Sequence, residues 1–152
     1  MKRLCTFVIA LTIGATTFVA AQEKSIELSA AQIQANRKVI IKTVVAPTSD
    51  QEAAFWQTYW EYRGHIAQLS DRVIALIKQY EESYEAMDDE TAQTMVDEVL
   101  AIDTRRANIR REYVKKFQKI LTLKQVVRWY QIENRLDAMA RVEMAASIPF
   151  AR

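Results

Sequence analysis

The sequence has one cysteine, two glycines and two prolines in 152 residues, and these low counts restrict the possible folds. Its cysteine is Cys5, so residues 22–152 contain none and cannot be cross-linked by a disulfide bond. Only Gly64, Pro47 and Pro149 interrupt these residues, which leaves few turn signals for β-hairpins or β-sandwiches. The chain is therefore predicted to be all-α, with its stability supplied by packing alone.

Residue types that carry chemistry are also scarce. The single histidine, His65, is more often a packing or surface residue than a ligand, and carboxylates alone do not make a typical zinc site. The sequence has no glycine-rich phosphate loop, and no nucleophile, histidine and acid form an identifiable catalytic set. We therefore expect a protein that is not an enzyme and that has no metal or other cofactor.

Residues 1–21 have the order of a secretory signal peptide. Lys2 and Arg3 precede an apolar stretch that ends in the small residues Ala20 and Ala21. The apolar stretch is shorter than the about 20 residues that span a membrane, so an uncleaved anchor is the less favoured alternative. Cleavage after Ala21 leaves residues 22–152 as a single helical domain, which we expect in the periplasm.

The charges balance in total but are separated along the chain. Without Lys2 and Arg3, the 21 basic residues become 19, against 19 acidic residues, which disfavours a nucleic-acid-binding protein. Residues 81–103 contain nine acids and no base, whereas residues 104–128 contain nine bases and one acid, Glu112. These blocks extend beyond the single turn over which a helix dipole acts, although a solvated surface remains the alternative explanation.

Apolar residues recur at spacings of four and three through most of the chain, as on one face of a helix. The first series predicts a helix over 49–86 and comprises Phe55, Tyr59, Tyr62, Ile66, Leu69, Val73, Leu76 and Tyr80. The second follows the acidic string "MDDETA" and comprises Met95, Val99, Ile102, Ile109, Tyr113, Phe117 and Ile120. Two such helices joined by a short turn form an antiparallel hairpin, about 50 Å long at 1.5 Å per residue.

Two further helices complete the predicted fold of four helices. One runs from Thr122 to Ser147 and stops before Pro149. The other covers 30–45, where β-branched residues would suit a strand, but a lone strand would have no partner for its backbone. An open, elongated hairpin with flanking helices is expected, and a closed up-down bundle is the alternative.

The string "LTLKQ" marks the start of the last helix. Thr122 can cap the first free amides, Gln125 can accept from the Thr122 amide, and Leu121 can pack on Val126 across the turn. This motif is predicted to stabilise the helix start, with Thr122→Ala costing about 1 kcal/mol and Gln125→Ala costing less.

Related strings occur twice more, with Ser29 and Gln32 after Leu28, and with Thr48 and Gln51, where Ser49 and Glu52 offer a competing frame. A cysteine-free helical chain with a signal peptide and repeats of this string resembles the Spy/CpxP family, also called the LTXXQ-motif family. The resemblance implies a helical hairpin that forms a cradle-like homodimer. It also implies an ATP-independent chaperone or envelope-stress adaptor for unfolded or specific envelope proteins, with a structural or regulatory protein for one dedicated target as the alternative.

The string "FWQTYWEY" places five aromatic residues within eight positions, spread over more of the helix than one narrow stripe. In an antiparallel hairpin the basic block returns beside this cluster, and the acidic block lies at the opposite end. Core packing is the alternative role for the aromatic residues. We expect a partner-binding surface at the basic and aromatic end, formed by Trp56, Trp60, Arg110, Arg111, Lys115 and Lys116.

Overall fold

The computed structural model describes residues 30–150, which form four α-helices and no strand. The helices are α2 (Ala30–Val45), α3 (Ser49–Ser83), α4 (Asp89–Phe117) and α5 (Leu123–Ser147). The chain divides into two units, 1–35 and 36–152, and the contacts described below belong to the second. The predicted all-α fold is confirmed, including the helix over 30–45. The expected signal peptide and the start of the Leu28 string lie outside the described residues.

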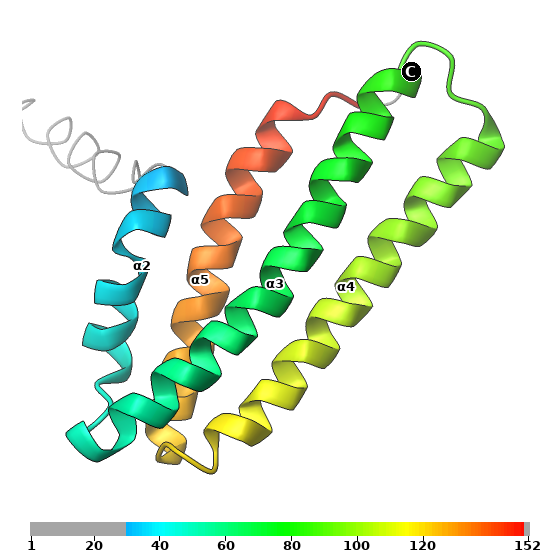
Figure 1. Ribbon diagram of the computed structural model, residues 1–152. Helices are drawn as coiled ribbons and strands as arrows, with labels where there is room; N and C mark the ends of the chain where they lie inside the picture. Colours follow the sequence, from blue (N-terminus) through cyan, green and yellow to red (C-terminus); the bar gives the residue numbers. More distant parts are fainter. Residues whose placement is uncertain (1–29, 151–152) are drawn as a thin grey trace, which may run out of the picture. The chain divides into compact units, whose positions relative to one another are not determined.

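Helices α3 and α4 form the predicted antiparallel hairpin, joined by residues 84–88 (Figure 1). The 35 residues of α3 correspond to about 52 Å of helix at 1.5 Å per residue. Asp88 caps the start of α4, and its carboxylate accepts a hydrogen bond of 2.8 Å from the Thr91 amide. Hydrogen bonds from Thr91 lower the pKa of Asp88, which keeps the negative charge that favours a helix N-terminus.

The core of the second unit is aromatic and lies where α5 packs against the first half of α3 and the second half of α4. Trp129 of α5 is fully buried, with its ring 4.3 Å from that of Phe117 and 5.2 Å from that of Tyr62, centre to centre. Phe55 and Phe117 are 5.5 Å apart across the hairpin, and Tyr62 and Tyr113 are 5.4 Å apart. These rings pack at tilted or edge-on angles, the arrangements that aromatic pairs prefer.

The apolar residues of the two predicted series are not equally buried along the hairpin. On α3, the first five residues of the series are buried, but Val73, Leu76 and Tyr80 are only half-buried. On α4, Val99 is 46 % exposed, so its predicted place in the core is wrong. Ile120, after the end of α4, is half-buried. Other members of the α4 series are buried as expected: Met95, Ile102, Ile109, Tyr113 and Phe117.

The predicted helix-start motif of α5 is confirmed and has a second role. Gln125 Oε1 accepts from the Thr122 amide at 2.9 Å, and the Thr122 hydroxyl accepts from the Gln125 amide at 3.4 Å. The other end of the Gln125 side chain leaves the helix: Nε2 donates to the Ala46 carbonyl at 2.9 Å and to Gln51 Oε1 at 3.0 Å. Gln125 therefore ties the start of α5 to the α2–α3 connection.

The α2–α3 connection uses the Thr48 frame of its own motif. Gln51 Oε1 accepts from the Thr48 amide at 3.0 Å, whereas Glu52 of the competing frame pairs with Lys42 at 2.7 Å. Ala46 has a φ of 50° and donates its amide to the Lys42 carbonyl, which is a left-handed helix end usually made by glycine. The side-chain Nε2 of Gln125 donates to the carbonyl of Ala46, so the Gln125 side chain stabilises the start of α5 and also the connection that precedes α3.

Because Gln125 also bonds to Ala46 and Gln51, we expect Gln125→Ala to cost more stability than Thr122→Ala. This is the reverse of the order predicted from the sequence. Gln125→Ala removes four hydrogen bonds and is expected to lower the free energy of unfolding by about 2 to 3 kcal/mol, against about 1 kcal/mol for Thr122→Ala. Urea unfolding of both variants measures the difference. Gln125→Glu is the informative control, because it keeps the acceptor for the Thr122 amide but cannot donate to Ala46 or Gln51. A smaller loss for Gln125→Ala than for Thr122→Ala would show that the link contributes nothing.

Candidate functional site

The aromatic part of the predicted surface is mostly internal. Phe55, Tyr59 and Tyr62 are fully buried, which confirms core packing for three of the five aromatic residues. Trp56 is half-buried between the Lys38 ammonium, 5.5 Å from its ring, and the ring of Trp60 at 5.9 Å. Trp60 is 49 % exposed, so it is the only one of the five with a large accessible area.

The basic residues of the predicted surface do not form one continuous patch. Arg110 is directed inward, with its side chain 16 % exposed and paired at 2.6 Å with Asp137, so its placement on an accessible surface is wrong. Lys116 lies 4.2 Å from the Tyr113 ring and 3.1 Å from Glu112. Arg111 and Lys115 remain exposed.

Arg110 belongs to a buried network of charged residues that the sequence analysis did not identify. Glu133 lies at the centre of this network, and its side chain is 2 % exposed. Arg37 Nη1 donates to both Glu133 oxygens at 2.9 and 3.0 Å, and the Tyr59 hydroxyl donates to Oε1 at 2.8 Å. Arg63 lies 3.4 Å from Glu133. The network joins α2, α3 and α5 through Glu133, and reaches α4 through Asp137 and Arg110.

The surroundings of Glu133 favour a charged and hydrogen-bonded state of its partners. Burial by itself would lower the pKa of Arg37, but the carboxylate of Glu133 and the contacts with Tyr59 and Asp137 raise it. Burial and the neighbouring carboxylate of Glu133 raise the pKa of Tyr59, which keeps the phenol protonated as a donor. These groups are paired with one another, so the network is a structural element that positions all four helices.

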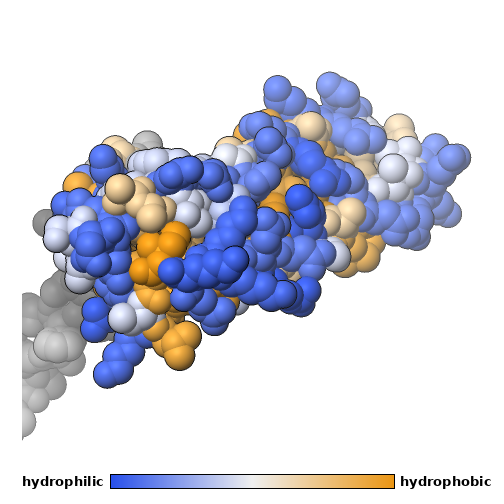
Figure 2. Space-filling model, turned by 60° about the horizontal axis from the view of Figure 1, so that its bottom comes forward, coloured by the Kyte–Doolittle hydropathy of each residue, from blue (hydrophilic) through white to orange (hydrophobic). Residues whose placement is uncertain are grey.

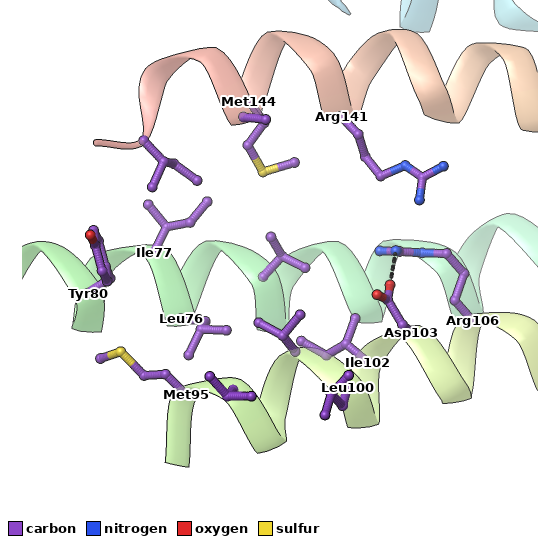
Figure 3. A pocket seen from close by; sticks show the side chains of 15 residues that line it. Leu76, Ile77, Tyr80, Met95, Leu100, Ile102, Asp103, Arg106, Arg141 and Met144 are labelled. Carbon is purple, nitrogen blue, oxygen red and sulfur yellow. Dashed lines mark hydrogen bonds and ion pairs between the residues drawn. The ribbon is translucent and has the colours of Figure 1, made fainter. Parts of the chain in front are cut away.

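An apolar groove lies at the other end of the hairpin, and we call it the turn-end groove. It has a volume of about 500 Å³ and lies between the second half of α3, the first half of α4 and the second half of α5 (Figure 3). It is lined by Val73, Leu76, Ile77, Tyr80, Met95, Val96, Val99, Leu100, Ile102, Asp103, Arg106, Arg141, Met144, Ala145 and Ile148.

Several aliphatic side chains of this groove are accessible rather than packed. Val96 is 54 % exposed, Val99 is 46 % exposed and Leu100 is 59 % exposed. All three residues line the groove from α4. The aromatic core fills the corresponding space at the opposite end of the hairpin. Helices α3, α4 and α5 thus enclose a packed interior at one end and leave an open apolar surface at the other.

The two ends of the turn-end groove differ in polarity. Figure 3 places Arg106, Arg141 and Asp103 together at one end, with Tyr80 and Met95 at the other. Arg106 pairs with Asp103 at 2.9 Å, whereas Arg141 is exposed. At the opposite end the Tyr80 hydroxyl donates to the Pro149 carbonyl at 2.9 Å, which holds the residues after α5 against α3.

The surface seen in Figure 2 is mainly hydrophilic. Figure 2 shows hydrophilic residues over most of one face, with hydrophobic residues in separate patches. A smaller hollow between Val44 and residues 128–135 of α5 is lined mainly by polar side chains. Among residues 30–150, no helix has the length and apolarity needed to cross a membrane, and no three potential metal ligands lie close together.

Comparisons of the chain with models of protein families, with curated proteins and with solved structures find no match. The resemblance to the Spy/CpxP family therefore remains a prediction from the sequence motifs. The site has to be interpreted from its own geometry.

Proposed function

We propose that the protein is an exported, periplasmic binding protein that holds apolar segments of partly unfolded envelope proteins without using ATP. The observation that supports this proposal is the turn-end groove, an open apolar surface built from three helices. Isolated exposed apolar residues are common on soluble proteins, but a contiguous apolar hollow of this kind is typical of a binding site. The secretory pattern of residues 1–21 supports export.

The lining of the groove suits clients of varied shape. Met95 and Met144 face it from α4 and α5, and methionine side chains adapt to different apolar partners because they are unbranched and flexible. Val96, Val99 and Leu100 on its α4 side are about half exposed, so a bound segment can leave the groove without any energy-driven step. A binding protein of this type would slow aggregation by covering the apolar segments of its clients for a short time.

The test measures light scattering of chemically denatured, unrelated client proteins with and without the purified protein. We expect the wild type to suppress scattering, and Val96→Asn with Val99→Asn to weaken suppression about tenfold, corresponding to about 1.4 kcal/mol of lost binding. Val39→Asn with Val127→Asn is the matched control, since these valines are 66 % and 53 % exposed and lie outside the groove.

Two outcomes would contradict the proposal. Equal suppression by the groove variant and the control variant would show that the turn-end groove does not bind clients. A wild type that suppresses aggregation of none of the clients would overturn the chaperone function and favour a single dedicated partner. Neither substitution alters a buried side chain, so melting temperatures close to that of the wild type are expected for both variants.

A further inference from the structure

The charges around the turn-end groove are the basis of a more specific inference about what binds there. Residues 81–103, which flank and line the groove, contain nine acids and no base. Glu81 and Glu82 follow Tyr80 directly on α3, and Asp89 and Glu90 begin α4 within about two turns of Met95. The acids are therefore concentrated at the end of the groove near the 84–88 connection.

Several of these acids carry an uncompensated charge. Glu98 is held by Arg72 at 2.8 Å and Asp103 by Arg106 at 2.9 Å, so these two are neutralised locally. In contrast, Glu81, Glu82, Asp89 and Glu90 are exposed and form no ion pair within residues 30–150. An exposed cluster of like charges attracts the opposite charge over about 10 Å at moderate ionic strength.

We propose that the turn-end groove binds a short amphipathic helix that is apolar on one face and basic at one end. This inference rests on the proposed function and adds the chemical class of the bound segment. The apolar face would lie on the groove, with the basic end beside Glu81, Glu82, Asp89 and Glu90. Arg141, which is exposed at the opposite end, repels a basic terminus there, and this repulsion fixes the direction of the bound segment.

The dimensions of the groove agree with an occupant of this kind. Its α4 side extends from Met95 to Arg106, about 16 Å at 1.5 Å per residue, which equals about three turns of a helix. Amphipathic helices in apolar grooves are a recurring form of recognition, in which a few apolar anchors spaced by three or four residues supply the affinity.

The test uses two synthetic helical peptides of about 12 residues with the same apolar face, one with lysines at its end and one with glutamates there. Fluorescence anisotropy measures binding of each labelled peptide to the purified protein. We expect the lysine peptide to bind at least about tenfold more tightly at low salt, and the ratio to fall towards one as salt screens the charges.

Variants of the protein show which residues cause the preference for the lysine peptide. Glu81→Gln, Glu82→Gln and Glu90→Gln together should remove most of the preference for the lysine peptide. The matched control, Glu52→Gln, Glu61→Gln and Glu112→Gln, makes the same change in net charge in the other half of the hairpin and should retain the preference. Val96→Asn with Val99→Asn should weaken binding of both peptides.

Each outcome separates this inference from the proposed function. If both peptides bind equally and both depend on Val96 and Val99, the groove binds apolar helices and the charge selectivity is overturned. If the lysine peptide binds independently of these valines, it is adsorbed by charge alone and the inference is also overturned. If neither peptide binds, the inference is overturned, and the light-scattering assay shows separately whether the proposed function holds.

Discussion

Glu133→Gln is expected to lower the free energy of unfolding by about 3 kcal/mol or more, because it leaves a buried guanidinium without its carboxylate. Removal of one partner from a buried ion pair typically costs about 3 to 5 kcal/mol. The Arg37 side chain is 5 % exposed and donates to both Glu133 oxygens, and Asp137 at 3.7 Å compensates it only in part. Chemical unfolding followed by circular dichroism measures the loss.

Two comparisons show whether the loss comes from the buried charge. Glu52→Gln makes the same change in an exposed pair with Lys42, where a small effect on the melting temperature is expected. Arg37→Met with Glu133→Leu removes both charges and should recover much of the stability, since apolar residues of similar volume can replace a buried pair. A Glu133→Gln variant as stable as the wild type would show that the network does not hold the helices together.

Trp129→Ala is expected to cost about 3 to 5 kcal/mol, the range for truncation of a large buried aromatic residue. The ring is fully buried and lies against Tyr62 of α3 and Phe117 of α4, so its removal leaves a cavity where three helices meet. The adjacent Tyr130 is 41 % exposed and provides the control, since Tyr130→Ala should change stability much less. Similar losses for the two variants would contradict the assignment of Trp129 to the centre of the core.

Helix class and approximate boundaries could be predicted because they depend on local information. The spacing of Phe55, Tyr59, Tyr62 and their successors predicts α3, and the Thr122 and Gln125 pair predicts the start of α5 to within one residue. Both signals lie within a few turns of the chain. They do not depend on how the helices are arranged.

The exposed Val99 and the half-buried Arg110 could not be predicted in the same way. A periodic series shows which face of a helix is apolar, but not how far along that face another helix covers it. The basic block was likewise interpreted as one surface, although Arg110 has an acidic partner on α5, Asp137, that only the packing of the helices brings close.

A signal for the buried network was nevertheless present in the sequence. Glu133 follows Val126 and Trp129 and precedes Leu136 at spacings of three and four, so a carboxylate occupies an apolar face. A charge at such a position is rarely buried without a partner. The sequence could therefore indicate that Glu133 is paired, but not that Arg37, 96 residues away, is the partner.

The link made by Gln125 also has a consequence for the order in which the chain folds. Helices α3 and α4 are neighbours joined by five residues, 84–88, so their hairpin can form early, with a small loss of chain entropy. Gln125 instead reaches Gln51 and Ala46 across 74 and 79 residues, and these bonds form only after α5 has returned along the completed hairpin. The α2–α3 connection therefore reaches its final geometry late, so its substitutions should mainly change the unfolding rate and leave the folding rate almost unaltered.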